Sequence, residues 1–249
     1  MFVTIGGNMA ANLYMTQVSS VQDVSPHMRR VVLTGESLAD FPVDKESAHI
    51  KAIFPDPSSQ DKLPTLSTSP DQRKWMRSYT IRQFNQSRRE LTIDFAVNDH
   101  QGLAADWALN AQPNDFLGVA GPGDIKHTDF GAHQHLFFGD ITALPAIAAT
   151  LEQLPLSSQG QAWLQVPDSE DIQEIIAPRG IKIHWLVTSN KLTERFLSGL
   201  QSVGCELTDT AIFIAAEASI VRQLKAYLSD HCQYTPEKLY ASAYWNSKR

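Results

Sequence analysis

The stretch His135-Leu136-Phe137-Phe138-Gly139-Asp140-Ile141-Thr142 decides the fold class of the second half of this 249-residue chain. A short apolar run ends at a glycine and an acidic residue, and a helical pattern over residues 142–154 follows at once. Strand, tight turn and helix in this order begin an α/β unit. The turn lacks the GxGxxG spacing of a dinucleotide fingerprint, so by itself it is a weak indicator of a nucleotide site.

Strand-like and helix-like segments alternate along the rest of the chain. The helix patterns rest on apolar side chains at helical spacing, such as Ile220, Leu224 and Leu228, or Ile172 and Ile176. We expect strands over residues 135–139, 161–166, 182–188, 211–216 and 239–244, and further helices over 169–177, 193–200 and 219–229. This alternation predicts a parallel sheet covered by helices.

The first half of the chain has the pattern of antiparallel β structure. Leu91, Ile93, Phe95 and Val97 alternate with other side chains at a period of two. Further strands are expected over residues 30–34, 49–54, 78–84 and 116–120, a loop over 55–69, and a ragged terminus over 1–14. Short strands at this spacing predict a small β-barrel, so the fold class is an antiparallel barrel followed by an α/β domain. We divide the chain into domains 1–127 and 128–249.

Composition narrows the classes of function. The chain is 43% hydrophobic and 19% charged, has a formal net charge of -6 and a pI near 5.7. A globular protein that binds neither nucleic acid nor membranes is expected, because such binders are usually basic. Cys205 and Cys232 lack metal-ligand spacing, so we expect them to pack as small buried side chains and expect no resident metal. Without a recognisable signal peptide or apolar span, we expect a cytoplasmic monomer.

The segment Arg77-Ser78-Tyr79-Thr80-Ile81-Arg82 is the most informative for chemistry. An arginine can bind two oxygens of a pyrophosphate, a tyrosine ring can stack on a planar heterocycle, and a threonine hydroxyl can bond a flavin nitrogen. The same residues would also suit a surface strand with two solvated arginines and a half-buried tyrosine. Spacing alone leaves both interpretations open.

The spaced residues Arg77-x-Tyr79-Thr80-x-Arg82 resemble the flavin motif of the siderophore-interacting protein family. This family comprises FAD-dependent ferric-siderophore reductases within the ferredoxin–NADP reductase superfamily. Similar segments follow in order at residues 94–95, 102–108, 121–123, 139–146, 215–219 and 243–245. The chain departs from the family pattern at Asn98, Ile141, Ala216 and Ala243, which leaves the fold intact but puts finer cofactor contacts in doubt.

The resemblance implies cofactor-binding roles at the matching positions. The flavin would contact residues of the motif, of the next strand and of a short helix whose free N–H groups face its pyrophosphate. The corresponding positions are Arg77, Ser78, Tyr79, Thr80, Asp94, Phe95, Gly102, Leu103, Ala104 and Ala105. NAD(P)H would face Asp140, Thr142, Pro145 and Glu217. Thr142 as a helix N-cap and Asp140 as a partner of the helix dipole are the structural alternatives.

The resemblance also implies a reaction. NADH or NADPH would give a hydride to FAD, and electrons would pass singly to Fe(III) in a siderophore, releasing Fe(II) in the cytoplasm without a catalytic side-chain nucleophile. NADH is favoured, because acidic residues and no arginine follow the second and third strands of the α/β half; reduced ferredoxin is an alternative donor. A basic cluster for a ferric catecholate would comprise Lys51, Lys126, Lys248 and Arg249. The alternatives are a reductase of a protein or of free flavin, and a siderophore carrier without catalysis.

Overall fold

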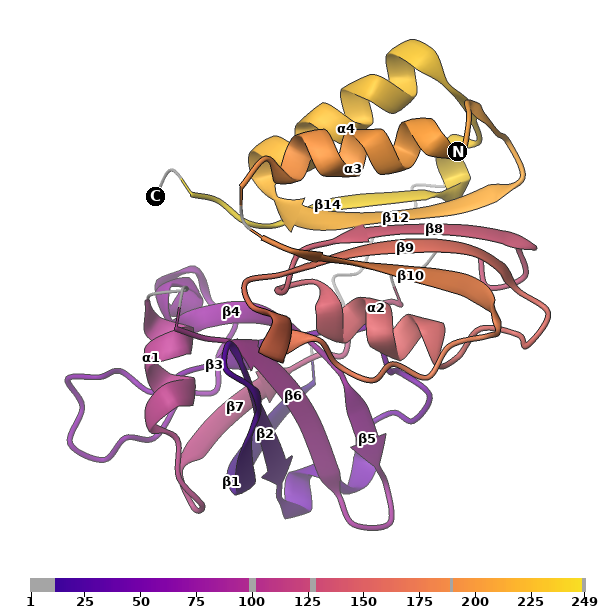
Figure 1. Cartoon of the computed structure of the whole chain (residues 1–249). Helices are drawn as coiled ribbons and strands as arrows, with labels where there is room; N and C mark the ends of the chain where they lie inside the picture. The colour runs from indigo at the N-terminus through magenta and orange to yellow at the C-terminus, as the bar shows by residue number, and fades with distance from the viewer. Residues whose placement is uncertain (1–11, 99–101, 126–128, 189, 248–249) are drawn as a thin grey trace, which may run out of the picture.

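A sheet that closes on itself forms the first half of the chain. The computed structural model describes residues 12–98, 102–125, 129–188 and 190–247. Seven antiparallel strands are ordered β4-β3-β7-β1-β2-β6-β5, and helix α1 (Leu103–Asn110) lies between β6 and β7 in the chain (Figure 1). The strands are β1 (Leu13–Ser25), β2 (Met28–Thr34), β3 (His49–Ile53), β4 (Met76–Thr80), β5 (Gln83–Asn85), β6 (Glu90–Ala96) and β7 (Phe116–Ala120).

The junction between β4 and β5 turns this sheet into a barrel. The two strands stand at opposite ends of the strand order, yet only Ile81 and Arg82 separate them in the chain. Ile81 N–H donates to the Ala48 carbonyl at 2.9 Å, beside β3, and Arg82 N–H donates to the Thr92 carbonyl of β6 at 3.0 Å. One continuous segment therefore pairs with both ends of the sheet, which closes it. The single strand expected over 78–84 is in fact two strands with this junction between them.

Strand β1 was not predicted. Residues 1–14 were expected to be a ragged terminus, but β1 begins at Leu13 and runs to Ser25. Its first part pairs with β7 and its second with β2. Only Tyr14, Thr16 and Val18 of this strand are buried, so the alternation of buried side chains covers only its first part.

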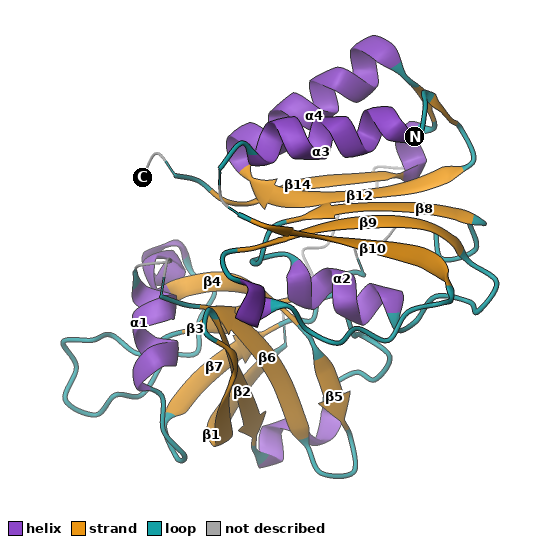
Figure 2. Cartoon of the chain, in the orientation of Figure 1, coloured by secondary structure: helices purple, strands orange, loops and turns teal. Residues whose placement is uncertain are grey.

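The second half is a parallel α/β domain. Its sheet has the order β10-β9-β8-β12-β14, with strands β8 (Gln134–Gly139), β9 (Gln159–Val166), β10 (Gly180–Val187), β12 (Thr210–Glu217) and β14 (Leu239–Trp245). Helix α2 (Leu144–Leu151) lies on one face, and α3 (Leu192–Ser202) and α4 (Ala218–His231) lie on the other (Figure 2). A two-stranded sheet of β11 (Glu206–Leu207) and β13 (Gln233–Tyr234) stands apart. The predicted fold class, an antiparallel barrel followed by a parallel α/β domain, is confirmed.

The helix predicted over residues 169–177 is wrong. A single 3-10 turn, Ser169–Asp171, is followed by extended chain, and Ile172 and Ile176 are 44% and 73% exposed. The reason is a tertiary contact: the Asp171 carboxylate is fully buried and accepts hydrogen bonds from Ser25 Oγ at 2.7 Å and from His27 N at 2.8 Å. This aspartate binds the turn between β1 and β2, so the segment packs on the barrel and does not form a helix.

In the part of the chain that the structure describes, no helix is both long enough and apolar enough to cross a bilayer. The domain boundary between residues 127 and 128 stays a prediction, because 126–128 lie outside the described residues.

Candidate functional site

The motif strand β4 is backed by a cluster of aromatic rings. The ring of Tyr79 lies 4.3 Å from that of Phe95 and 6.5 Å from that of Phe54, centre to centre. Trp107 of α1 packs on the same two rings at 5.8 and 5.5 Å. Burial raises the pKa of Tyr79 above its usual range, although the charge of Arg77 opposes this, so its hydroxyl stays protonated at neutral pH. Tyr79 is thus a rigid, neutral aromatic surface in β4.

Cationic side chains lie on the same strand pair. Arg77 is exposed, and its Nη1 donates to the carbonyls of Lys74 and Met76 at 2.9 and 2.8 Å, which fixes the guanidinium. Lys51 of β3 stands opposite Ser78 of β4 and donates to its hydroxyl at 2.5 Å. A predicted substrate-binding cation therefore contacts a predicted cofactor-binding residue. The other predicted substrate residues, Lys126, Lys248 and Arg249, lie outside the described residues.

Within the described residues, no side-chain hydrogen bond caps the N-terminus of helix α1. Gly102 stands at the N-cap with a φ of 121°, a conformation that glycine adopts without strain. The Leu103 and Ala104 side chains pack toward the barrel core and Ala105 is buried, so backbone N–H groups are what this end of the helix offers. Unpaired N–H groups and the positive end of the helix dipole bind phosphate oxygens.

The side chains of Asp94 and Phe95 in β6 contact other side chains of the protein. The Asp94 side chain is 2% exposed and accepts two hydrogen bonds of 2.7 Å from Arg30. Phe95 is fully buried behind Tyr79. Their observed roles are to support the motif strand, and a direct contact of either with a cofactor stays a prediction.

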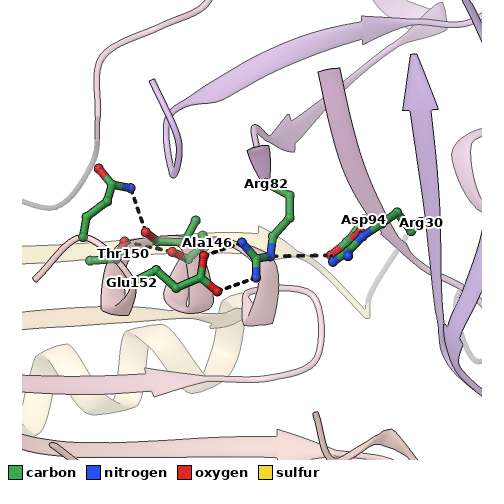
Figure 3. Close-up of polar contacts among 8 residues, drawn as sticks. Arg30, Arg82, Asp94, Ala146, Thr150 and Glu152 are labelled. Atoms are coloured by element: carbon green, nitrogen blue, oxygen red, sulfur yellow. Dashed lines mark hydrogen bonds and ion pairs between the residues drawn. The ribbon is translucent and has the colours of Figure 1, made fainter. Parts of the chain in front are cut away.

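Arg82, the last residue of the motif, joins the two domains (Figure 3). Its guanidinium donates to both carboxylate oxygens of Glu152, just past α2, at 2.7 and 2.6 Å. Its Nε lies 3.9 Å from Asp94 Oδ2, so the charges alternate from Glu152 through Arg82 and Asp94 to Arg30. The sequence did not indicate this ion-pair chain, because the two partners of each link are far apart in the chain.

Asp140 accepts hydrogen bonds from residues at the ends of three strands, at the carboxyl edge of the parallel sheet. Its Oδ1 accepts from Thr142 N at 3.0 Å and from Thr142 Oγ1 at 2.5 Å. Its Oδ2 accepts from Glu217 N at 3.0 Å, at the end of β12, and from Trp245 Nε1 at 2.8 Å, at the end of β14. The alternative that Thr142 caps a helix is wrong, because α2 begins at Leu144 with Ala143 at its N-cap. Pro145 is buried in the first turn of α2.

Glu217 is a buried carboxylate at the same edge. It caps α4 and accepts hydrogen bonds from Ser219 N at 2.6 Å, from the Ser219 hydroxyl, and from Ser247 Oγ at 3.1 Å. Burial alone would raise the pKa of Glu217, but the hydrogen bonds from Ser219 and Ser247 lower it to about 2. Its negative charge is therefore retained at neutral pH.

Tyr244 lies near the end of β14, at this edge. Burial raises the pKa of its hydroxyl well above the usual range, Tyr240 and Asp140 act in the same direction, and Thr80 opposes them. The bonds between the flavin motif and the α/β domain that the structure shows are those of Arg82 with Glu152.

A groove of about 760 Å³ runs beside α3 and the edge strand β10. Its floor is a stacked pair of rings, Trp163 and His184, with centres 5.0 Å apart and planes 9° apart. Burial, and then the charge of Lys182, lowers the pKa of His184, so the ring is neutral. Lys191 and Arg195 line the same groove. The sequence analysis did not identify Arg195, which lies in the first turn of α3, the helix that follows β10.

Two family descriptions match the chain. The siderophore-interacting FAD-binding domain covers residues 17–126, and the siderophore-interacting protein covers residues 132–248. The ferric vibriobactin reductase ViuB of Vibrio cholerae is 34% identical over 232 residues, which span 89% of this chain and 85% of that protein. This chain belongs to the siderophore-interacting protein family. The family resemblance inferred from the Arg77–Arg82 motif is confirmed.

Three further proteins are similar to this chain, one in sequence and two in structure. The NADPH-dependent ferric-chelate reductase of Escherichia coli is 32% identical over 240 residues, covering 93% of this chain and 92% of that protein. The crystal structure of the siderophore-interacting protein SipS from Aeromonas hydrophila superimposes with a TM-score of 0.85 at 32% identity, covering 96% and 93% of the two chains. A ferredoxin–NADP+ reductase from Plasmodium falciparum, at a TM-score of 0.61 and 13% identity, shares the fold alone.

Proposed function

We propose that this protein is an FAD-dependent reductase of ferric siderophores that uses NAD(P)H as its electron donor. The observation that carries the proposal is the convergence of the Asp140, Glu217 and Trp245 side chains at the carboxyl edge of the parallel sheet, in a chain whose barrel carries the flavin motif. Nucleotides bind at this edge in open α/β sheets. The printed names of the two relatives, a ferric vibriobactin reductase and a ferric-chelate reductase, support the same reaction class.

The residues on the barrel fit FAD. The uncapped N-terminus of α1 and the fixed guanidinium of Arg77 suit a pyrophosphate, and Tyr79 supplies a flat neutral ring. Thr80 follows Tyr79 at the end of β4 and supplies a hydroxyl for the flavin ring. When bound, FAD supplies the conversion of two-electron hydride chemistry into single-electron transfer. The chain itself supplies the binding groups, and its buried aromatic cluster excludes water behind Tyr79.

The groove beside α3 changes the donor that we propose. The missing arginine after the second and third strands predicted NADH, but Arg195 and Lys191 both line the groove at the start of α3. A cation pair suits a 2′-phosphate. We therefore propose NADPH as the preferred donor, in line with the name of the Escherichia coli relative. Reduced ferredoxin remains an alternative donor to test.

The proposed substrate is an anionic ferric siderophore, with a catecholate favoured. Lys51 is exposed at the strand pair that carries Ser78 and Thr80, so an anion bound there would lie next to the flavin motif. Lys126, Lys248 and Arg249 are the further cations that we propose for the cluster. Reduction weakens the complex, because hard oxygen donors hold Fe(III) more tightly than Fe(II). Release of Fe(II) in the cytoplasm and a monomeric enzyme are part of the proposal.

Acceptor and donor comparisons test this function. The FAD-loaded protein should form chelator-trapped Fe(II) from a ferric catecholate, and do so faster with NADPH than with NADH. Faster reduction of free flavin or of a protein acceptor would favour a general flavin reductase. Binding of the ferric siderophore by a protein that takes up no FAD would favour a carrier. A rate seen only with reduced ferredoxin would change the donor alone.

A further inference from the structure

The two cysteines of the chain lie side by side at the far end of the α/β domain. Cys205 directly precedes β11 and Cys232 directly precedes β13, and these strands pair in parallel with Glu206 opposite Gln233. One residue upstream, this register puts Cys205 opposite Cys232. The Gln233 N–H also donates to the Cys205 carbonyl at 2.8 Å. Neighbouring strands lie about 4.8 Å apart, within the Cα separation that a disulfide spans.

The Cys205 side chain also reaches the helix that Cys232 ends. Its Sγ lies 3.9 Å from Oη of Tyr227 in α4, and Cys232 is the C-cap of that helix. Both cysteines are free thiols of intermediate exposure. The prediction that both pack as small buried side chains is wrong, because both are of intermediate exposure; each directly precedes one of the two paired strands β11 and β13. A small oxidant can reach such a pair, because neither side chain is fully buried.

We propose that Cys205 and Cys232 are an oxidisable thiol pair that forms an intramolecular disulfide on reaction with hydrogen peroxide. In the first step one thiol takes an oxygen from the peroxide, giving a sulfenic acid and water. In the second step the other thiol attacks the sulfenic sulfur, and the S–S bond forms as a second water leaves. The two sulfur atoms lose two electrons and two protons in all, and one peroxide is reduced to two waters.

The disulfide would join the two helices that cover one face of the sheet. Cys205 follows α3 by a short turn, and Cys232 is the C-cap of α4 (Figure 2). Glu217, at the candidate site, caps the opposite end of α4, about 20 Å away along a helix of this length. We therefore expect oxidation to stabilise the layer of α3 and α4 and to leave turnover largely unchanged. The inference does not depend on the proposed function.

Mass spectrometry of the full-length protein under non-reducing conditions tests the proposal. After limited hydrogen peroxide, the intact mass should fall by two hydrogen atoms, and one cross-linked peptide pair should contain both cysteines. The melting temperature should rise by roughly 5 °C or more, and a thiol reductant should reverse both changes. Oxygen added to either sulfur without a bridge, disulfide-linked dimers, or two persistent free thiols would each overturn the proposal.

The serine variants test whether each thiol resolves the sulfenic acid of the other. In Cys232→Ser and in Cys205→Ser, dimedone should label a sulfenic acid at the remaining cysteine after peroxide, because no resolving thiol remains. The wild-type protein should take up little dimedone, and labelling of the wild type as strong as that of the variants would contradict the resolving step. If a variant misfolds, the joint loss of iodoacetamide labelling at both cysteines of the wild-type protein after peroxide gives the same test.

Discussion

Replacing Arg82 by methionine removes the ion pair that joins the barrel to α2 while retaining much of the side chain's length. Arg82 and Glu152 are 17% and 28% exposed and share two hydrogen bonds of 2.7 and 2.6 Å. Solvent-exposed pairs contribute about 0.2–1 kcal/mol, and hydrogen bonds to charged groups about 1.5–3 kcal/mol. For this partly buried, two-pronged pair we expect a coupling free energy of about 1.5 kcal/mol in the cycle formed by Arg82→Met, Glu152→Gln and the double variant.

Arg30→Met is the matched control within the same ion-pair chain. It leaves the Asp94 carboxylate, 2% exposed, with Arg82 as a more distant cation at 3.9 Å. An uncompensated buried charge costs about 3–5 kcal/mol, so Arg30→Met should lower the free energy of unfolding more than Arg82→Met does. Urea unfolding followed by circular dichroism measures both. A coupling below about 0.5 kcal/mol, or a larger loss in Arg82→Met than in Arg30→Met, would refute this account of the domain junction.

Three further predictions concern the candidate site. Lys51→Gln should raise the KM for a ferric catecholate by about 3–10-fold at low salt and leave FAD absorbance unchanged, whereas the surface control Lys225→Gln should change neither; a steady-state titration in the two variants decides this. Arg195→Ala should raise the KM for NADPH by about 10-fold or more and leave the KM for NADH nearly unchanged. The control variant Arg222→Ala should change neither KM. An equal effect of Arg195→Ala on both donors would exclude a contact to the 2′-phosphate. The pKa of Glu217 falls from 4.5 to about 2 on folding, so its charge stabilises the protein fully above pH 4.5 and this stabilisation disappears as the pH falls to about 2. The wild type should exceed Glu217→Gln in unfolding free energy by up to about 3 kcal/mol at pH 7, and the difference should shrink over that acidic range; a difference independent of pH would contradict it.

The parallel half of the fold was predictable because each of its elements carries its own local pattern. The strand at residues 135–139 and the helix at 219–229 were expected within a few residues of β8 and α4. Their buried residues alternate or recur at the period of the element that they form, and this periodicity is local information. The failed helix at 169–177 shows the limit: its isoleucines have helical spacing, but Asp171 binds Ser25 and His27 on another domain.

The residues of the candidate site also differ in how far the sequence could predict their positions. The motif from Arg77 to Thr80 lies on one strand, so its residues could be found together in the sequence. Asp140, Glu217 and Trp245 meet because three parallel strands end at one edge, and the topology alone predicts that closeness without the hydrogen bonds. The contact between Cys205 and Cys232 depends on the register of two strands of two residues each, for which the sequence carries no recognisable signal.

The most direct test of the central claim is a visible spectrum of the FAD-loaded protein under anaerobic conditions. NADPH should bleach the flavin bands, and a ferric catecholate added next should restore them while a chelator traps Fe(II). Bands that NADPH bleaches but the iron complex does not restore would contradict the assignment as a ferric-siderophore reductase. A purified protein that remains colourless after incubation with FAD would contradict the flavin site itself.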